Sequence, residues 1–504
     1  MNATPTATAP DHTTIATLLV DELVAALVNT RIYLANHPRV ETSLTAALRR
    51  LGELVDLTQD PVCIAGIDGL VVFQQRPLLG ASMSAARLLG ALQLWGAGGL
   101  ELRRATTLSE LGELLAGLAT RPRPGQDLAA LNAQLVERQC RNVRLLPPYV
   151  DALGLLQKTT STNIRVGVHF YQSIVDLLQT VTVSVCRGGQ IDFGPVQGQA
   201  EQMLRQLEEN DTALLSLARQ DQYDAFTFGH SVRVAILSLN FARTLTDDRE
   251  LLIRIGTAAL LHDVGKSLIP FELLHSTGTL DAEQRRAMNR HSDLGAECLL
   301  DHHDSDPLAI AAAFAHHRSP DGSGYPRTLH EHETTMVTSI VKICDIYEAL
   351  TAARPYKQPM SPIRAYRVML AMGDKLDRRL LKQFVQGNGI HPAGQFVELD
   401  DGEVAVVRRQ NADPLQPVVA LVDRPDAMVT VEEEQLLDLS QIECCGARAI
   451  LRDLTPQEVE QRLADRPPRT RREPPPSAPP HPPKPEPPPT QPAQKQIVNP
   501  FRWD

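Results

Sequence analysis

The sequence contains 504 residues, more than one ordinary domain, and its 43% hydrophobic content is typical of globular proteins with two or three domains. The formal net charge of −10 argues against a nucleic-acid polymer as partner, so an anionic ligand must be attracted by a local site. The seven cysteines include no CxxC pair, which indicates a reducing cytoplasm rather than a disulfide framework or a zinc ribbon. There is no apolar run of the roughly 18 residues needed to span a membrane.

The N-terminal part predicts an α/β module at residues 15–150, after a flexible Ala-, Thr- and Pro-rich leader at residues 1–14. Two patterns with helical spacing precede two β-favouring runs, which Asp68 and Gly69 join as a hairpin turn. The elements expected are helices at 17–35, 44–57, 84–94 and from about 107, and strands on both sides of the turn and at 100–103 and 143–146. The module shows no glycine-rich phosphate loop and no clustered ligand residues. We interpret it as a regulatory or dimerisation module, with a plain scaffold as the alternative.

Residues 151–222 predict a helical connector between this module and the rest of the chain. Segments 170–185 and 196–217 carry apolar residues at helical spacing. Because this stripe lacks sustained heptads, we interpret it as intramolecular core rather than as the seam of a homodimer. Coupling of the module through these helices is a hypothesis.

The segment 260–266, with the sequence LLHDVGK, is the most informative part of the chain. An apolar, helix-like run at 251–261 places His262 and Asp263 at the end of a buried helix, and Gly265 is expected to help end that helix. An ionised aspartate beside a histidine is costly to bury among apolar residues unless a positive charge compensates it. A metal ion would supply that charge.

Five further residues of metal-ligand type stand in apolar, helix-compatible stretches: His230, His291, His316, His317 and Asp345. A lone histidine on an apolar helix is more often a hydrogen-bonded core residue than a ligand, but seven candidates in one segment favour a metal site. Imidazole and carboxylate without thiolate suit iron, manganese or zinc, and the set is large enough for two ions that share a bridging carboxylate. His302 and His303, by contrast, lie in a polar loop and are predicted to be exposed to solvent.

Beyond the helical segment, residues 389–455 predict a small β-rich appendage, with a hairpin turn at Asp401 and Gly402 and a further strand at 418–422. From about residue 466 the composition becomes proline-rich, which favours extended polyproline II and predicts a disordered tail at 466–504. The tail could offer a polyproline ligand or its terminal NPFRWD to a partner, although a plain linker is the commoner role.

The stretch from about Asp224 to His391 resembles the HD-GYP domain, a branch of the HD phosphohydrolase superfamily. The matching motifs are HSVRV at 230–234, HDVGKSLIP at 262–270, the segment 288–291, HHRSPDGSGYP at 316–326 and DIYEALTAARPYK at 345–357. The order and spacing of five separate motifs make this match specific. The resemblance implies a mainly α fold, with an all-helical HD-type catalytic domain at 223–388.

The resemblance also implies an activity, because the family hydrolyses the bacterial second messenger cyclic di-GMP to pGpG and in some members onward to GMP. All seven residues above would be metal ligands for two divalent ions, iron or manganese, with Asp263 as the bridging ligand. Lys266 would reach the substrate phosphate, and Arg354 and Lys357 would hold the other phosphate and the guanine end. Gly324, Tyr325 and Pro326 form the GYP signature, which we assign to substrate binding. Diguanylate cyclases with GGDEF domains are the partners that the family suggests.

Three positions depart from the family pattern. Arg318 stands where glutamate commonly follows the two histidines, and Pro320 replaces an aromatic residue. Phe226 stands where some members carry a glutamate that helps to hold a third metal ion, so we expect two metal ions. Arg318 keeps open a different cyclic dinucleotide or nucleotide as substrate. A receptor that binds cyclic di-GMP with little turnover is the alternative from another functional class.

Overall fold

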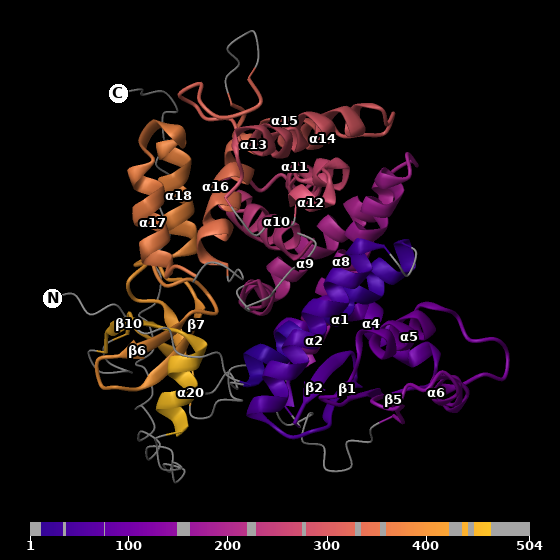
Figure 1. Ribbon diagram of the computed structural model, residues 1–504. Coiled ribbons are helices and arrows are strands. Elements are labelled where there is room, and N and C mark those ends of the chain that lie inside the picture. The colour runs from indigo at the N-terminus through magenta and orange to yellow at the C-terminus, as the bar shows by residue number, and fades with distance from the viewer. Residues whose placement is uncertain are drawn as a thin grey trace, which may run out of the picture. The chain divides into compact units, whose positions relative to one another are not determined.

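The computed structural model of the protein describes residues 12–33, 37–74, 76–148, 162–218, 228–274, 279–327, 334–352, 359–422, 436–441 and 448–464. Most of the predicted leader and the whole predicted tail at 466–504 lie outside these ranges. The last three leader residues, 12–14, belong to the first helix and are therefore not a flexible segment. The fold class is mainly α, as predicted, with one antiparallel sheet in each terminal part of the described chain (Figure 1).

The N-terminal sheet has five antiparallel strands in the order β3-β2-β1-β4-β5. Its strands are β1 (Val62–Ile67), β2 (Leu70–Phe73), β3 (Arg76–Pro77), β4 (Gly99–Leu102) and β5 (Val143–Leu146). The predicted hairpin is confirmed: Ile67 pairs with Leu70, and Asp68 and Gly69 between them have φ angles of 49° and 75°. Positive φ at both turn residues is what a two-residue hairpin turn requires.

Six helices in the described part of this module accompany the sheet: α1 (His12–Ile32), α2 (Pro38–Leu57), α3 (Leu79–Ser84), α4 (Ala86–Leu94), α5 (Leu108–Ala119) and α6 (Leu128–Glu137). Helix α5 begins at a capping box, in which Thr107 accepts from the backbone N–H of Glu110 and Glu110 accepts from that of Thr107. The sequence analysis predicted α1, α2, α4 and α5 but missed α3 and α6. The first has only six residues, and the second follows a loop of Pro, Arg and Gly.

The predicted connector forms two long helices, α8 (Thr162–Cys186) and α9 (Phe193–Leu217). The apolar stripe of α9 is buried in the same core as the helices that follow it. Its residues there are Val196, Ala200, Met203, Leu204 and Leu207. The stripe is therefore intramolecular core, as predicted.

Helix α8 contacts both the N-terminal sheet and the helical core. Its Gln172 donates a side-chain N–H to the carbonyl oxygen of Gly69, 3.0 Å away, in the β1–β2 turn. The next residue back, Tyr171, donates its hydroxyl to the carbonyl oxygen of Gly229, 3.1 Å away, at the start of α10 (Phe228–Ala242). Two adjacent residues of one helix thus hold two different parts of the chain.

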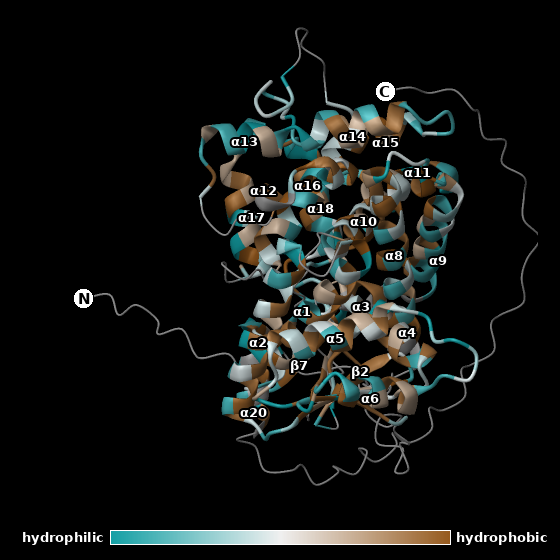
Figure 2. Ribbon diagram, turned by 45° about the vertical axis from the view of Figure 1, so that its right-hand side comes forward, coloured by the Kyte–Doolittle hydropathy of each residue, from teal (hydrophilic) through white to brown (hydrophobic). Residues whose placement is uncertain are grey.

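The described residues between 228 and 388 form helices and no strand. The longer helices are α10 (Phe228–Ala242), α11 (Arg249–Leu261), α13 (Ala282–Asn289), α14 (His291–Leu300), α15 (Pro307–Ala315), α16 (Met336–Thr351), α17 (Pro362–Ala371) and α18 (Arg378–Asn388). Short helical turns are η1 (Val264–Leu268), α12 (Phe271–Leu274) and η2 (Gly373–Lys375). Figure 2 shows α15 as mainly hydrophobic and α13 as mainly hydrophilic, and α13 has no buried residue. Helices α11, α15 and α16 bury apolar faces and carry the polar residues discussed below.

The C-terminal sheet has the order β10-β6-β7-β8-β9. Its strands are β6 (Phe396–Leu399), β7 (Val404–Arg409), β8 (Val418–Leu421), β9 (Leu436–Asp438) and β10 (Ile450–Leu454), and α20 (Pro456–Ala464) follows. The predicted hairpin is confirmed by the pairing of β6 with β7 around Gly402, whose φ is 78°. Among the described helices, none combines the length and the apolar character that crossing a membrane requires.

Candidate metal centre

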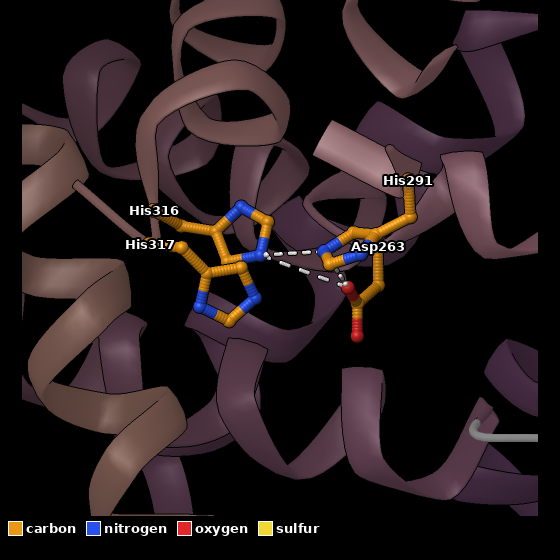
Figure 3. Close-up of side chains that lie close together, drawn as sticks. All are labelled: Asp263, His291, His316 and His317. Atoms are coloured by element: carbon orange, nitrogen blue, oxygen red, sulfur yellow. Dashed lines mark hydrogen bonds and ion pairs between the residues drawn. The ribbon is translucent and has the colours of Figure 1, made fainter. Parts of the chain in front are cut away.

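All seven residues predicted as metal ligands come together at one place in the helical core. They form two groups, within each of which the potential ligand atoms lie within 4.8 Å of one another. The first group is Asp263, His291, His316 and His317 (Figure 3), and the second is His230, His262 and Asp345. Six of the seven are buried, and the His317 side chain is 26% exposed. Residues up to 115 positions apart in sequence thus meet at one centre.

The elements deliver these residues from their ends and inner faces. His230 lies in the first turn of α10, His291 is the first residue of α14, and Asp345 lies on the buried face of α16. The other four residues lie in the turns that follow α11 and α15. A polar turn at the end of an apolar helix lets its side chains reach the core. The backbone of the turn is then not placed in apolar surroundings.

Gly265 has a different role from the one that we predicted. It does not adopt the left-handed φ of a helix-ending glycine; instead, η1 approaches the start of α14 at this residue. A Cβ atom on Gly265 would lie 2.0 Å from the carbonyl oxygen of His291 and 2.5 Å from the backbone nitrogen of Gly295. The absence of a side chain is what lets the turn at Asp263 and the ligand His291 lie side by side.

Asp263 belongs to the first group and also faces the second. Its Oδ2 is 3.5 Å from Nε2 of His230 and 3.3 Å from Nε2 of His262. Its Oδ1 is 3.5 Å from Nε2 of His291 and 3.7 Å from Nε2 of His316. Each carboxylate oxygen therefore faces a different pair of histidine Nε2 atoms.

Three of the histidines donate the Nδ1 proton to a backbone carbonyl oxygen in the preceding turn. The pairs are His262 with Ala259 at 2.7 Å, His291 with Met288 at 2.8 Å, and His316 with Ala312 at 2.8 Å. A carbonyl oxygen only accepts, so Nδ1 carries the proton and Nε2 of each neutral ring presents a lone pair. Hydrogen bonds of this kind fix the tautomer and orientation of metal-binding histidines.

The lone pairs point at one another. The Nε2 atoms of His291 and His316 are 3.4 Å apart, and neither has a proton to share when both rings are neutral (Figure 3). Nε2 of His262 and Oδ1 of Asp263 are buried with no hydrogen-bond partner. Buried polar atoms without partners are rare in folded proteins. These imidazole nitrogens and carboxylate oxygens make poor hydrogen bonds with one another. Metal ions would give their lone pairs a partner, so the set of residues fits cations.

The protonation states of His291, His316, His317 and Asp263 agree with this. Burial lowers the pKa values of His291, His316 and His317, the last to about 3, so these rings are neutral at pH 7. Burial alone would raise the pKa of Asp263, but Lys266 and the neighbouring histidines outweigh it and hold that pKa well below its usual value. Nζ of Lys266 donates directly to Oδ2 of Asp263. Neutral imidazoles and ionised carboxylates are the forms that bind metal.

The sequence analysis missed Glu348, which positions His230. Oε2 of Glu348 is 2.6 Å from Nδ1 of His230, and its Oε1 accepts from Nε of Arg233 at 2.7 Å. Burial would lower the pKa of His230, but the charge of Glu348 and the hydrogen bonds to two aspartates raise it well above its usual value. The signal for this residue was its place three positions after Asp345, on the same face of a helix.

The GYP signature forms the loop beside His317. Gly324 has a φ of 95°, and a Cβ atom there would lie 2.2 Å from the carbonyl oxygen of His317, so only glycine fits. The ring of Tyr325 lies over that of His317, with centroids 4.5 Å apart, and meets His291 edge-on at 6.0 Å. Pro326 follows a cis peptide bond.

Other residues singled out in the sequence analysis lie outside the two groups or outside the described residues. Arg354, Lys357 and Phe226 lie outside the described residues. His303 is exposed, as predicted, but the prediction for His302 is wrong: it is buried, and its Nε2 accepts from the backbone N–H of Ile191 at 2.8 Å. That partner lies 111 positions away, so the polar residues around His302 gave no sign of it.

Comparison with known protein families finds a match within the helical part of the chain. Residues 207–380 match the family model described as HD domain. This match agrees with the resemblance that the sequence motifs carry.

The relatives with established names are phosphodiesterases of cyclic dinucleotides. The chain is 32% identical over 228 residues to the cyclic di-GMP phosphodiesterase PA4108 of Pseudomonas aeruginosa, which is 45% of this chain and 55% of that protein. It is 36% identical over 149 residues to the 3'3'-cGAMP-specific phosphodiesterase 3 of Vibrio cholerae, covering 30% of this chain and 32% of the relative. It is 36% identical over 155 residues to a cyclic di-GMP phosphodiesterase of Thermotoga maritima, covering 30% and 42%. The match spans about half the length of the first relative and less of the others.

Proposed function

We propose that this protein is a metal-dependent phosphodiesterase that hydrolyses cyclic di-GMP to pGpG, and further to GMP. The observation that carries the proposal is the position of Asp263, whose two carboxylate oxygens face two separate histidine pairs at 3.3–3.7 Å. The printed names of the relatives in Pseudomonas aeruginosa and Thermotoga maritima support the substrate.

We infer that the two groups of residues hold two divalent ions, iron or manganese, because imidazole and carboxylate ligands suit both. Such a pair would supply an activated water and neutralise the charge on the phosphate oxygens. Asp263 would hold both ions, and His291, His316 and His317 would complete one ligand group.

The remaining roles belong to side chains around this centre. Lys266 places a fixed positive charge next to Asp263, where it can bind a non-bridging phosphate oxygen. Tyr325 covers His317 and offers an aromatic face at the edge of the centre. For Arg354 and Lys357 we propose the contacts that the resemblance implies, with the second phosphate and the guanine base.

A second candidate substrate is 3'3'-cGAMP. Arg318 follows the two histidine ligands where glutamate is common in the family, and one relative is named as specific for 3'3'-cGAMP. Turnover of both dinucleotides by the same purified sample separates the candidates, and an Arg318→Glu variant tests whether this position sets their ratio. A ratio unchanged by the substitution would remove Arg318 from the account of specificity.

Fewer observations support the proposals about partners and cellular location. The five cysteines described by the structure are free thiols, which supports a reducing compartment such as the cytoplasm. Regulation by the N-terminal module, docking of GGDEF proteins, dimerisation and a partner for the tail are proposals carried by the sequence alone.

The experiment that tests the function measures cyclic di-GMP turnover and bound metal on one sample of the full chain, beside Asp263→Ala. We expect about two metal ions per wild-type chain, with pGpG formed only by the wild type. The variant should lose metal and activity together, because removal of the bridging carboxylate leaves two cations facing each other. An Asp263→Ala protein that keeps both would show that the site is assigned wrongly. Tight nucleotide binding without product would instead favour the receptor.

A further inference from the structure

Lys342 is a buried lysine for which the activity described above gives no role. It lies on α16 and is 7% exposed. Its Nζ donates to the carbonyl oxygen of His317 at 3.1 Å, to that of Arg318 at 2.8 Å, and to Oγ of Ser319 at 3.0 Å. All three acceptors belong to the segment that directly follows α15.

These contacts use the full donor capacity of the side chain. An ammonium group has three N–H donors, and burying it is costly unless each finds an acceptor. Lys342 therefore ties three consecutive residues to one point on α16. No carboxylate takes part in the three hydrogen bonds, so the lysine holds the backbone of a loop and does not simply neutralise an acid.

The loop tied in this way contains both His317 and the GYP signature. It closes on itself, because the backbone N–H of Ser319 donates to the carbonyl oxygen of Ser323 at 2.9 Å. Gly324 packs against the same His317 carbonyl oxygen that accepts from Lys342. One carbonyl oxygen thus links the lysine, the ligand and the signature.

The position of Lys342 on α16 adds to this. Lys342, Asp345 and Glu348 follow one another at intervals of three residues and share one face of the helix. Asp345 faces the metal-binding groups, and Glu348 orients His230. Lys342 reaches the backbone of His317, while Oδ2 of Asp345 lies 4.0 Å from Nδ1 of its ring.

We propose that Lys342 is a positioning residue that sets the metal affinity of the group containing His317. The inference rests on the metal centre of the proposed function, not on the identity of the substrate. Loss of the three hydrogen bonds would release His317 and Tyr325 together while leaving Asp263, His291 and His316 in place. The expected effect is weaker binding of one ion rather than loss of the whole centre.

The test replaces Lys342 by methionine, which keeps the length of the side chain and removes its donors. Metal-free full-length protein is titrated with Mn²⁺, and the free ion is followed by its electron paramagnetic resonance signal. We expect the affinity of one ion to fall about tenfold or more, the usual effect of losing a group that orients a ligand. A His317→Ala variant, titrated in parallel, identifies which ion that is. Lys342→Arg should restore part of the affinity, because guanidinium also donates to carbonyl oxygens.

Two controls separate positioning from general damage. Lys382→Met removes an exposed lysine from α18 and should leave Mn²⁺ binding unchanged. Asn132→Leu breaks buried hydrogen bonds to Leu145 in the N-terminal module, so it should destabilise the protein without changing the Mn²⁺ affinity. If Lys342→Met does not fold, Ser319→Ala removes one of the three acceptors and should give a smaller loss of affinity in the same direction.

The second readout is turnover at rising Mn²⁺ concentration. Excess Mn²⁺ should restore much of the kcat of Lys342→Met but not that of His317→Ala, which lacks the ligand itself. Wild-type Mn²⁺ affinity in Lys342→Met, or an equal loss for both ions, would overturn the inference. If the wild type binds Mn²⁺ but does not hydrolyse cyclic di-GMP, the proposed substrate fails while the titration still decides the role of Lys342.

Discussion

Lys266 illustrates how one side chain at this centre can serve two purposes. Without a metal ion it compensates the charge of Asp263, to which its Nζ donates directly. It is not one of the residues that form the two ligand groups. Its contribution to metal retention and its contribution to turnover can therefore be separated.

We predict that Lys266→Ala keeps the wild-type metal content and lowers kcat by about 10²–10³, the cost of removing one donor from a developing negative charge. Steady-state kinetics and metal analysis of the same sample check this. Simultaneous loss of metal would mean that the lysine stabilises the ligand set and not the reacting phosphate.

Glu348 differs from Lys266, because it acts on the centre only through other side chains and should therefore affect metal retention. Its carboxylate holds Nδ1 of His230 and the guanidinium of Arg233. Glu348→Gln preserves size and one acceptor but removes the charge. We predict a 10–100-fold weaker metal affinity, as is usual when a partner of a ligating histidine is changed. Titration with Mn²⁺, beside an exposed Glu283→Gln control on α13, measures it; equal affinities would exclude this role.

At the scale of elements, the close contact between η1 and α14 is the feature that sequence patterns described least well. Gly265 was expected to end a helix, whereas its lack of a side chain allows two backbone segments to touch. A periodicity argument concerns one element at a time and cannot reveal such a contact.

We predict that Gly265→Ala destabilises the protein by about 1–3 kcal/mol, the typical cost of overpacking, because the new Cβ atom meets backbone that cannot move aside. Gly90→Ala in α4 is the matched control. Apart from its chain neighbours and the backbone of its own helix, no atom lies within 4 Å of its Cβ position, so alanine should be neutral or stabilising there. Thermal unfolding of both variants measures the difference, and equal stabilities would contradict the packing argument.

That the seven residues of the two groups belong to one cluster could be predicted because each is a histidine or aspartate in an apolar stretch, visible within a few positions. Both hairpins could be predicted because Asp-Gly turns are local signals. Lys342 and His302 could not, since their partners lie 24 and 111 positions away, and Glu348 carried only the signal of its spacing from Asp345. What decides their roles is packing between helices, which no short segment encodes.

At the scale of the whole molecule, α8 connects the N-terminal sheet with the helical core through Gln172. Its side-chain amide donates to Gly69 and to the carbonyl oxygen of Ser82. Gln172→Leu would remove this donor from the part-buried carbonyl oxygen of Gly69 and from that of Ser82, which also accepts from the backbone N–H of Ala85 at 3.4 Å. We expect a cost of about 1–3 kcal/mol for the acceptor of Gly69. We predict that the sheet module then unfolds at a lower temperature than the helical core in calorimetry. A single transition at the wild-type temperature would show that this contact does not hold the two parts together.

The adjacent residues Tyr171 and Gln172 connect the two parts through one helix. The carbonyl oxygen of Gly69 accepts one hydrogen bond, and that of Gly229, the neighbour of His230, accepts the other. A ligand that displaced the β1–β2 turn would therefore pull on the backbone next to a metal-binding histidine within the span of two side chains. In mechanical terms, a single helix of this kind would pass a small displacement of the β1–β2 turn on to the start of α10 as a rigid lever, without order being lost in between.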